Sequence, residues 1–146
     1  MKTSNYFENK KTINFGFKLS TEIETKITDW KQNNTFFGVF PIKGDSMTCD
    51  DLAKSIPNGS KVLAYDLEID CNKTLDEVWY KIPIREVVLI TGETNTGEKF
   101  NLCKTINFVN AHDGYVVIKS HNENYKDQCI PFTWIKSIFK VVQIIQ

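Results

Sequence analysis

Short apolar runs, separated by polar segments that contain Gly, Asn or Pro, fill the chain from residue 36 onward. The runs are rich in β-branched and aromatic residues, which favours strands over helices. They cover residues 36–42, 61–65, 87–91, 100–108, 115–119 and 135–145. The segment from Gly92 to Gly97 has the composition of a turn and predicts a β-hairpin. The pattern predicts a mainly β fold of short twisted sheets or a partly closed barrel, with one or two short helices.

Helical periodicity marks the segment of residues 20–33, before the first predicted strand. Three apolar residues recur there at helical spacing: Ile23, Ile27 and Trp30. Thr21 and Glu24 fit a capping box, which strengthens the prediction of a helix. Residues 22–27 also alternate as a strand does, so a strand is the alternative.

Two further segments interrupt the pattern of predicted strands, and the N-terminus shows no such pattern. Residues 49–56 have the composition of a second short helix, ended by Pro57-Asn58-Gly59. Residues 68–83 are expected to form an insertion or a long loop. The polar N-terminus, rich in Lys, Asn and Thr, is typical of a flexible arm. We therefore predict an N-terminal arm with a short helix, residues 1–35, and one folded domain, residues 36–146.

The composition argues against several classes of function. The 18 basic and 18 acidic residues balance, so no polyanionic partner is required. The four cysteines lie far apart and only two histidines are present, so we expect reduced thiols, no metal site and no cofactor. Because the chain shows no signal-like N-terminus and no run of 18 apolar residues, we expect neither secretion nor membrane spanning, and infer a cytoplasmic location.

The strongest chemical signal is Gly44-Asp45-Ser46-Met47, at the end of an apolar run. Gly allows a tight turn, and a serine just after it can present its hydroxyl while nearby backbone N–H groups face a developing oxyanion. We therefore take Ser46 as the candidate nucleophile, with Gly44, Asp45 and Met47 as turn and oxyanion support. An ordinary Gly-Asp turn is the alternative.

A serine hydroxyl is a weak nucleophile and needs a base. Neither His112 nor His121 lies in a triad motif, the Gly-x-Ser-x-Gly elbow is absent, and His112-Asp113-Gly114 predicts a hairpin turn. Both histidines are therefore poor candidates for the base.

Lys104 is the better candidate for the base. It shares one face of a predicted strand with Leu102 and Ile106, and burial there would lower its pKa far below the ordinary value of about 10.4. An exposed lysine at a sheet edge is the structural alternative. Lys99, which flanks the turn, is the second candidate.

Taken in order, these motifs resemble the C-terminal peptidase domain of LexA, UmuD and phage repressors over residues 40–146. The tetrapeptide around Ser46 matches the nucleophile motif, and the Lys104 strand after Gly97-Glu98 resembles the strand with the general-base lysine. Asn122-Glu123-Asn124-Tyr125 matches the family's Asn-x-x-Tyr segment, so Asn122 and Tyr125 join the candidate site. Residues 139–145 resemble the closing strand.

Two departures from the family pattern stand out. Gly59-Ser60 replaces the usual Gly-Asp before a strand. The spacing between Ser46 and Lys104 is wider than usual, and the excess falls in residues 68–83.

The resemblance implies a Ser/Lys-dyad serine endopeptidase that cleaves its own N-terminal arm in an SOS-like DNA-damage or phage-repressor response. A RecA-type filament would be the co-protease. The family cuts Ala-Gly or Cys-Gly bonds, and the candidate bond here is Phe15-Gly16, although Phe is bulkier. Phe37-Gly38 lies too close to Ser46 to fold back into the site.

The first 40 residues are too few for a helix-turn-helix domain, so the chain is not expected to read DNA directly. It would be either a UmuD-like protein that serves a translesion polymerase, or a repressor peptidase domain separated from its DNA-binding partner. The alternative function is a non-cleaving dimerisation module of a transcriptional repressor, forming a homodimer through the C-terminal strand, residues 138–145. A single-strand nucleic-acid binder, suggested by several aromatic residues, is disfavoured by the zero net charge.

Overall fold

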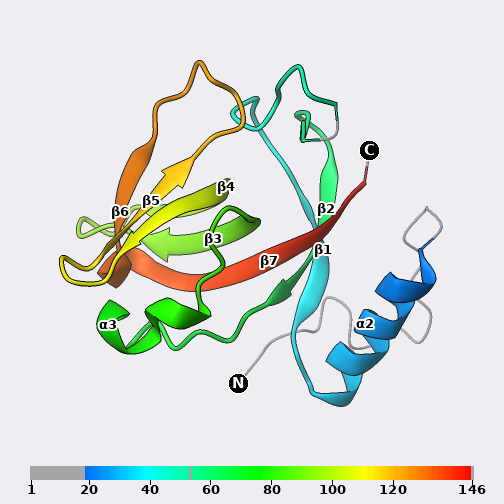
Figure 1. Ribbon diagram of the computed structural model, residues 1–146, viewed down its shortest axis with the longest axis horizontal. Coiled ribbons are helices and arrows are strands. Elements are labelled where there is room, and N and C mark those ends of the chain that lie inside the picture. Colours follow the sequence, from blue (N-terminus) through cyan, green and yellow to red (C-terminus); the bar gives the residue numbers. More distant parts are fainter. Residues whose placement is uncertain (1–18, 53, 146) are drawn as a thin grey trace.

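The computed structural model describes residues 19–52 and 54–145, and within them a single antiparallel sheet of seven strands. The strands are β1 (Phe37–Pro41), β2 (Lys61–Asp66), β3 (Val87–Glu93), β4 (Lys99–Asn110), β5 (Tyr115–Lys119), β6 (Gln128–Pro131) and β7 (Ile135–Ile145). Their order across the sheet is β1-β2-β7-β3-β4-β5-β6 (Figure 1). The predicted mainly β fold is confirmed. The sheet is not closed into a barrel, because β1 and β6 remain as its two edges.

Helix α2 (Thr21–Gln32) forms where the helical periodicity predicted it. Its N-cap is Ser20 rather than Thr21, because the Ser20 hydroxyl accepts a hydrogen bond from the backbone N–H of Ile23 at 3.1 Å. The apolar face of the helix packs on β1 and β2 through Trp30, whose ring stacks on Tyr65 at a centroid distance of 4.8 Å. Within the described residues, the helix is thus attached to the sheet.

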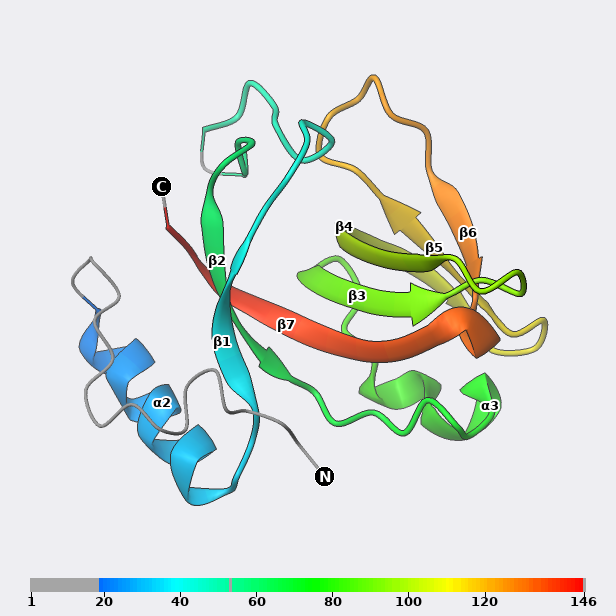
Figure 2. The ribbon, with the colours of Figure 1, turned by 180° about the vertical axis from the view of Figure 1, so that it is seen from behind.

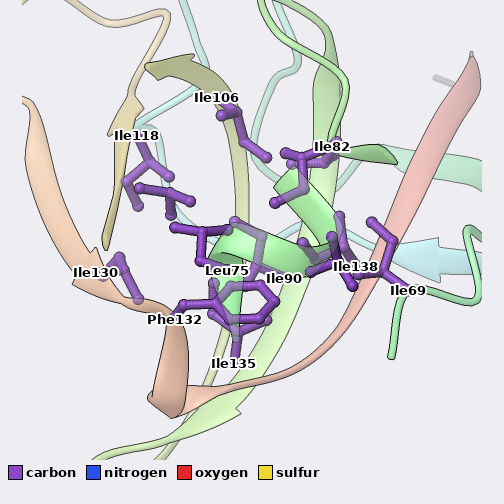
Figure 3. Packing of buried hydrophobic residues seen from close by; sticks show 13 residues of the cluster. Ile69, Leu75, Ile82, Ile90, Ile106, Ile118, Ile130, Phe132, Ile135 and Ile138 are labelled. Carbon is purple, nitrogen blue, oxygen red and sulfur yellow. The ribbon is translucent and has the colours of Figure 1, made fainter. Parts of the chain in front are cut away.

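The main core lies between the sheet and the chain that crosses it from β2 to β3. Its members are isoleucines, valines and a few larger side chains that interdigitate (Figure 3). Residues 68–83, predicted as an insertion or long loop, contain α3 (Leu75–Val78) and the short 3-10 helix η1 (Trp79–Lys81). This segment buries Leu75 and Ile82 in the core, so it covers one face of the sheet.

The predicted short helix over residues 49–56 is wrong for the residues described there, which form turns and bends. Only one turn forms among them, with the N–H groups of Lys54 and Ser55 both donating to the carbonyl of Asp51. The Cys49 N–H donates instead to the hydroxyl of Ser55, and the Ile56 N–H donates to the carbonyl of Met47. These bonds fold the segment back on the turn that follows β1.

Strand β6 was missed from the sequence because it is short and only Ile130 within it is buried. The 3-10 helix η2 (Phe132–Trp134) leads from β6 into β7. In both views of the ribbon, the β1–β2 loop and the β5–β6 loop meet on the side of the molecule away from α3 (Figures 1 and 2). Across residues 19–52 and 54–145, no helix is long and apolar enough to cross a membrane.

Candidate active site

A cavity of about 430 Å³ opens where the β1–β2 and β5–β6 loops meet the end of β4. The β1–β2 loop contributes Ser46, together with the two residues before it. Strand β4 contributes Lys104 and Leu102, and the residue just after β5 is Ser120. The fold thus brings the two central candidates, far apart in sequence, to one cavity.

The turn that carries Ser46 depends on a glycine. Gly44 has a φ of +86°, a left-handed conformation that glycine adopts without a Cβ penalty. Its N–H donates to the side-chain oxygen of Asn58 at 2.9 Å, and Met47 is fully buried on the far side of the turn. Ser46 therefore lies between two anchored residues, Gly44 and Met47. Its own side chain is half-buried and lines the cavity.

Asn122, from the β5–β6 loop, holds the carbonyl groups of the same turn. Its backbone N–H donates to the Ser46 carbonyl at 2.8 Å, and its side-chain amide donates to the Asp45 carbonyl at 3.0 Å. The Tyr125 hydroxyl also donates to the Asp45 carboxylate. The predicted pair Asn122 and Tyr125 therefore lies directly against the nucleophile motif.

This arrangement determines where the backbone N–H groups point. In a trans peptide the C=O and N–H point in opposite directions, so the N–H groups of Ser46 and Met47 face away from Asn122. Neither N–H makes a hydrogen bond within the part of the chain that the structure describes. By contrast, the Gly44 N–H is already bonded to Asn58. The N–H groups of Ser46 and Met47 are therefore candidate oxyanion donors.

Lys104 is buried, with 6% of its surface exposed, as the strand pattern predicted. Its Nζ donates a hydrogen bond to the Ser120 hydroxyl at 2.8 Å and lies 5.6 Å from the centroid of the Tyr125 ring. Burial lowers the pKa of Lys104 below its ordinary value. A larger fraction of the amine is thus neutral, and able to accept a proton, than in an exposed lysine.

Lys99, the second candidate for the base, is exposed at the start of β4, opposite Glu93, and does not line the cavity. Lys99 is therefore the exposed lysine of this strand, whereas Lys104 is buried.

Neither histidine is among the residues that line the cavity. The His121 Nδ1 bonds to the carbonyl of Lys54 at 2.7 Å, and its Nε2 bonds to the hydroxyl of Thr105 at 3.0 Å. Because a carbonyl only accepts, Nδ1 carries a hydrogen. His112 lies exposed in the β4–β5 turn before Gly114, which has a φ of +77°, as the turn composition predicted.

No family model, curated protein sequence or solved structure matches this chain. The residues that line the cavity are therefore the structural basis for a functional assignment. Over residues 19–52 and 54–145, no cluster of three or more His, Cys, Asp or Glu side chains is placed to hold a metal ion.

Ser120, Lys126 and Gln128 line the cavity but were not found from the sequence. Ser120 is 4% exposed and bonds directly to Lys104. Lys119 pairs with Thr105, which places Ser120 opposite Lys104, but this pairing follows a register shift in β4 that the sequence pattern does not mark.

Proposed function

We propose that this chain is a serine endopeptidase of the LexA/UmuD type, with Ser46 as nucleophile and Lys104 as general base. The observation that carries the proposal is a buried lysine with a lowered pKa in the same cavity as a serine on a fixed turn. A lysine of this kind can replace the histidine of a serine triad.

The first half of the reaction forms an acyl-enzyme. The Ser46 hydroxyl oxygen attacks the scissile carbonyl carbon while its proton passes to the neutral Nζ of Lys104. The carbonyl oxygen becomes an oxyanion, which the N–H groups of Ser46 and Met47 stabilise. When the intermediate collapses, the C–N bond breaks and the Lys104 ammonium gives its proton to the leaving amine.

The second half restores the enzyme. A water molecule attacks the ester carbonyl, and Lys104 accepts the proton of that water. The Ser46 oxygen then leaves and takes the proton back from the ammonium. The Lys104 amine is neutral again at the end, and neither half of the reaction requires a metal or a cofactor.

The substrate we propose is the chain's own N-terminal segment, cut at Phe15-Gly16. This bond lies outside the described residues, so the proposal rests on its sequence and on the resemblance. By the same resemblance, a RecA-type filament would trigger the cut in the cytoplasm. The product would then act with a translesion polymerase or a separate DNA-binding partner.

Intact-mass measurements test this proposal. The purified chain would be incubated at pH 7 and pH 10, with and without RecA-type filaments on single-stranded DNA. We expect fragments that mark a cut after Phe15 in the wild type and in Lys99→Ala, and none in Ser46→Ala or Lys104→Ala. A wild type that stays intact under every condition would contradict self-cleavage.

A second candidate function, a dimerisation module, is favoured by one feature of β7. This strand pairs with β3 only over Ile135–Lys140, whereas residues 141–145 pair with β2 alone. In the part of the chain that the structure describes, the residues after Lys140 therefore present one open strand edge, which a second copy could pair with. Light scattering over a range of concentrations tests this idea, since a strict monomer would rule it out and an intact dimer without cleavage would favour it over the peptidase.

A further inference from the structure

His121 contacts both the loop that carries Ser46 and the strand that carries Lys104. Its backbone N–H donates to the sulfur of Met47, the residue after Ser46, at 3.4 Å. Its ring nitrogen Nε2 bonds to the hydroxyl of Thr105, the residue after Lys104, at 3.0 Å. One residue is therefore in contact with the chain neighbours of both members of the Ser/Lys pair.

The His121 ring itself also reaches the loop. Its Nδ1 carries a hydrogen and donates to the carbonyl of Lys54 at 2.7 Å. In the neutral ring Nε2 then has a lone pair, so it accepts a hydrogen bond from the Thr105 hydroxyl. Because the ring is rigid, these two bonds fix the β1–β2 loop relative to β4.

We propose that His121 is a positioning residue for the reaction, holding the β1–β2 loop against β4 so that the Ser46 hydroxyl stays directed at Lys104. This inference rests on the proposed peptidase function and deepens it. His121 does not line the cavity, and both of its ring nitrogens are engaged. It therefore neither reacts nor touches the substrate, and acts only through the segments that it joins.

Apolar packing brings the same segments together but does not fix their direction. Met47 packs with Ile42, Ile56 and Val62, and Cys103 of β4 lies against this cluster. Hydrophobic contact is non-directional, whereas a hydrogen bond weakens steeply when it is misaligned. A misplacement of about 1 Å can cost roughly 100-fold in rate. The two ring bonds of His121 supply the direction that the apolar cluster lacks.

The neighbouring residue, Asn122, has a different task. Its hydrogen bonds go to the carbonyls of Asp45 and Ser46, so they join the turn to the β5–β6 loop. The bond between His121 and Thr105 adds the connection to β4, the strand of the base.

The test uses variants that keep the shape of a side chain and remove its hydrogen bonds. His121→Phe keeps a ring but loses both ring bonds, and Thr105→Val replaces the hydroxyl by a methyl group. Thr105→Ser keeps the hydroxyl. His112→Phe is the matched control, because His112 lies exposed in the β4–β5 turn. Self-cleavage rates would be measured by intact mass from pH 8 to pH 11.

We expect the plateau rate to fall by about 10- to 100-fold in His121→Phe, and by about 10-fold in Thr105→Val, through loss of alignment. Thr105→Ser and His112→Phe should cleave like the wild type. The midpoint of the pH profile should stay at the wild-type value in every variant, because the Lys104 amine keeps its burial. A midpoint that moves with the rate would overturn the positioning role, since it would indicate a disturbed lysine.

The double variant His121→Phe/Thr105→Val gives a second readout. Both changes remove the same bond between the loop and β4, so the double variant should lose no more than His121→Phe alone. Two separate packing defects would instead multiply their losses. Circular dichroism and urea unfolding check the fold. If His121→Phe does not fold, the comparison of Thr105→Val with Thr105→Ser tests the bond by itself.

The possible results separate the two proposals. A wild type that never cleaves contradicts the peptidase, and the positioning role falls with it. A wild type that cleaves, with unchanged rates in His121→Phe and Thr105→Val, overturns the positioning role alone. Equal losses in Thr105→Ser or His112→Phe would also overturn it, because they would indicate packing rather than the hydrogen bonds.

Discussion

Asn122 holds the nucleophile turn from the opposite loop, donating its backbone N–H to the Ser46 carbonyl at 2.8 Å and its side-chain amide to the Asp45 carbonyl at 3.0 Å. The residue that the sequence motif singled out, Asn122, therefore holds the backbone of the turn that carries Ser46. These bonds fix the carbonyl groups of the turn, so that the N–H groups of Ser46 and Met47 point away from Asn122.

Replacement of Asn122 by Ala should lower the self-cleavage rate by up to about 100-fold, because the oxyanion donors lose their fixed direction. The fold should remain, since the backbone bond to Ser46 is kept. Asn124→Ala is the matched control, because Asn124 contributes only a backbone N–H to this loop. Rates from intact mass, with circular dichroism for the fold, check both variants, and equal losses in the two would contradict this role.

Gly44→Ala and Gly59→Ala form a second matched pair. Both glycines have a φ near +90°, and a Cβ at either site would contact nothing within 4 Å. Each change should therefore destabilise the chain by about 1–2 kcal/mol through the backbone alone. Only Gly44→Ala should also reduce cleavage, because Gly44 shapes the turn of Ser46. Urea unfolding together with cleavage rates tests the distinction.

Lys104→Met should abolish cleavage, a loss of at least about 100-fold, and leave the fold intact. Because burial lowers the folded-state pKa of Lys104 below its ordinary value of 10.5, the folded chain binds fewer protons than the unfolded chain between those two pKa values. Stability from this group therefore rises with pH across that window. We therefore expect Lys104→Met to raise the free energy of unfolding, relative to the wild type, by more at pH 7 than at pH 10. Chemical denaturation at both pH values measures this difference. Lys99→Met should show no such difference.

The cysteines should differ sharply in reactivity, because the thiolate is the reactive form. Burial raises the pKa of Cys103 to about 12 and that of Cys71 to about 11, while Cys129 is exposed. At pH 8, iodoacetamide should label Cys129 well before Cys103 or Cys71. Peptide mapping gives the order, and early labelling of Cys103 would show that the β4 core opens.

The Tyr125 hydroxyl should ionise at a higher pH than an ordinary tyrosine. Its hydrogen bond to the Asp45 carboxylate, and the charge of that carboxylate, raise its pKa. Asp45→Asn should bring the ionisation to lower pH. Ultraviolet titration, with Tyr125→Phe to identify the signal, measures this shift.

The hydrophobic pattern was enough to predict most of the sheet, because the apolar runs are rich in β-branched and aromatic residues, and β3 buries every second residue. It also predicted the burial of Lys104, from its neighbours Leu102 and Ile106. It could not predict β6, whose four residues include one buried side chain. Nor could it predict Ser120, because the partner of Lys104 depends on a one-residue bulge that leaves no mark in the apolar pattern.

The false helix at residues 49–56 has a similar cause. Its local composition allowed a helix, but the hydrogen bond from the Ile56 N–H to the Met47 carbonyl is longer than a helical one and folds the chain back on the turn that carries Ser46. Tertiary contacts of this kind override local preference.

The most direct test of the central claim is the rate of self-cleavage as a function of pH in the wild type, Ser46→Ala and Lys104→Met. A single ionisation of Lys104 predicts a wild-type rate that rises with pH to a plateau, with its midpoint below 10.5, and no fragments from either variant. A rate independent of pH, or fragments from Lys104→Met at the wild-type rate, would contradict the assignment of Lys104 as the base for Ser46.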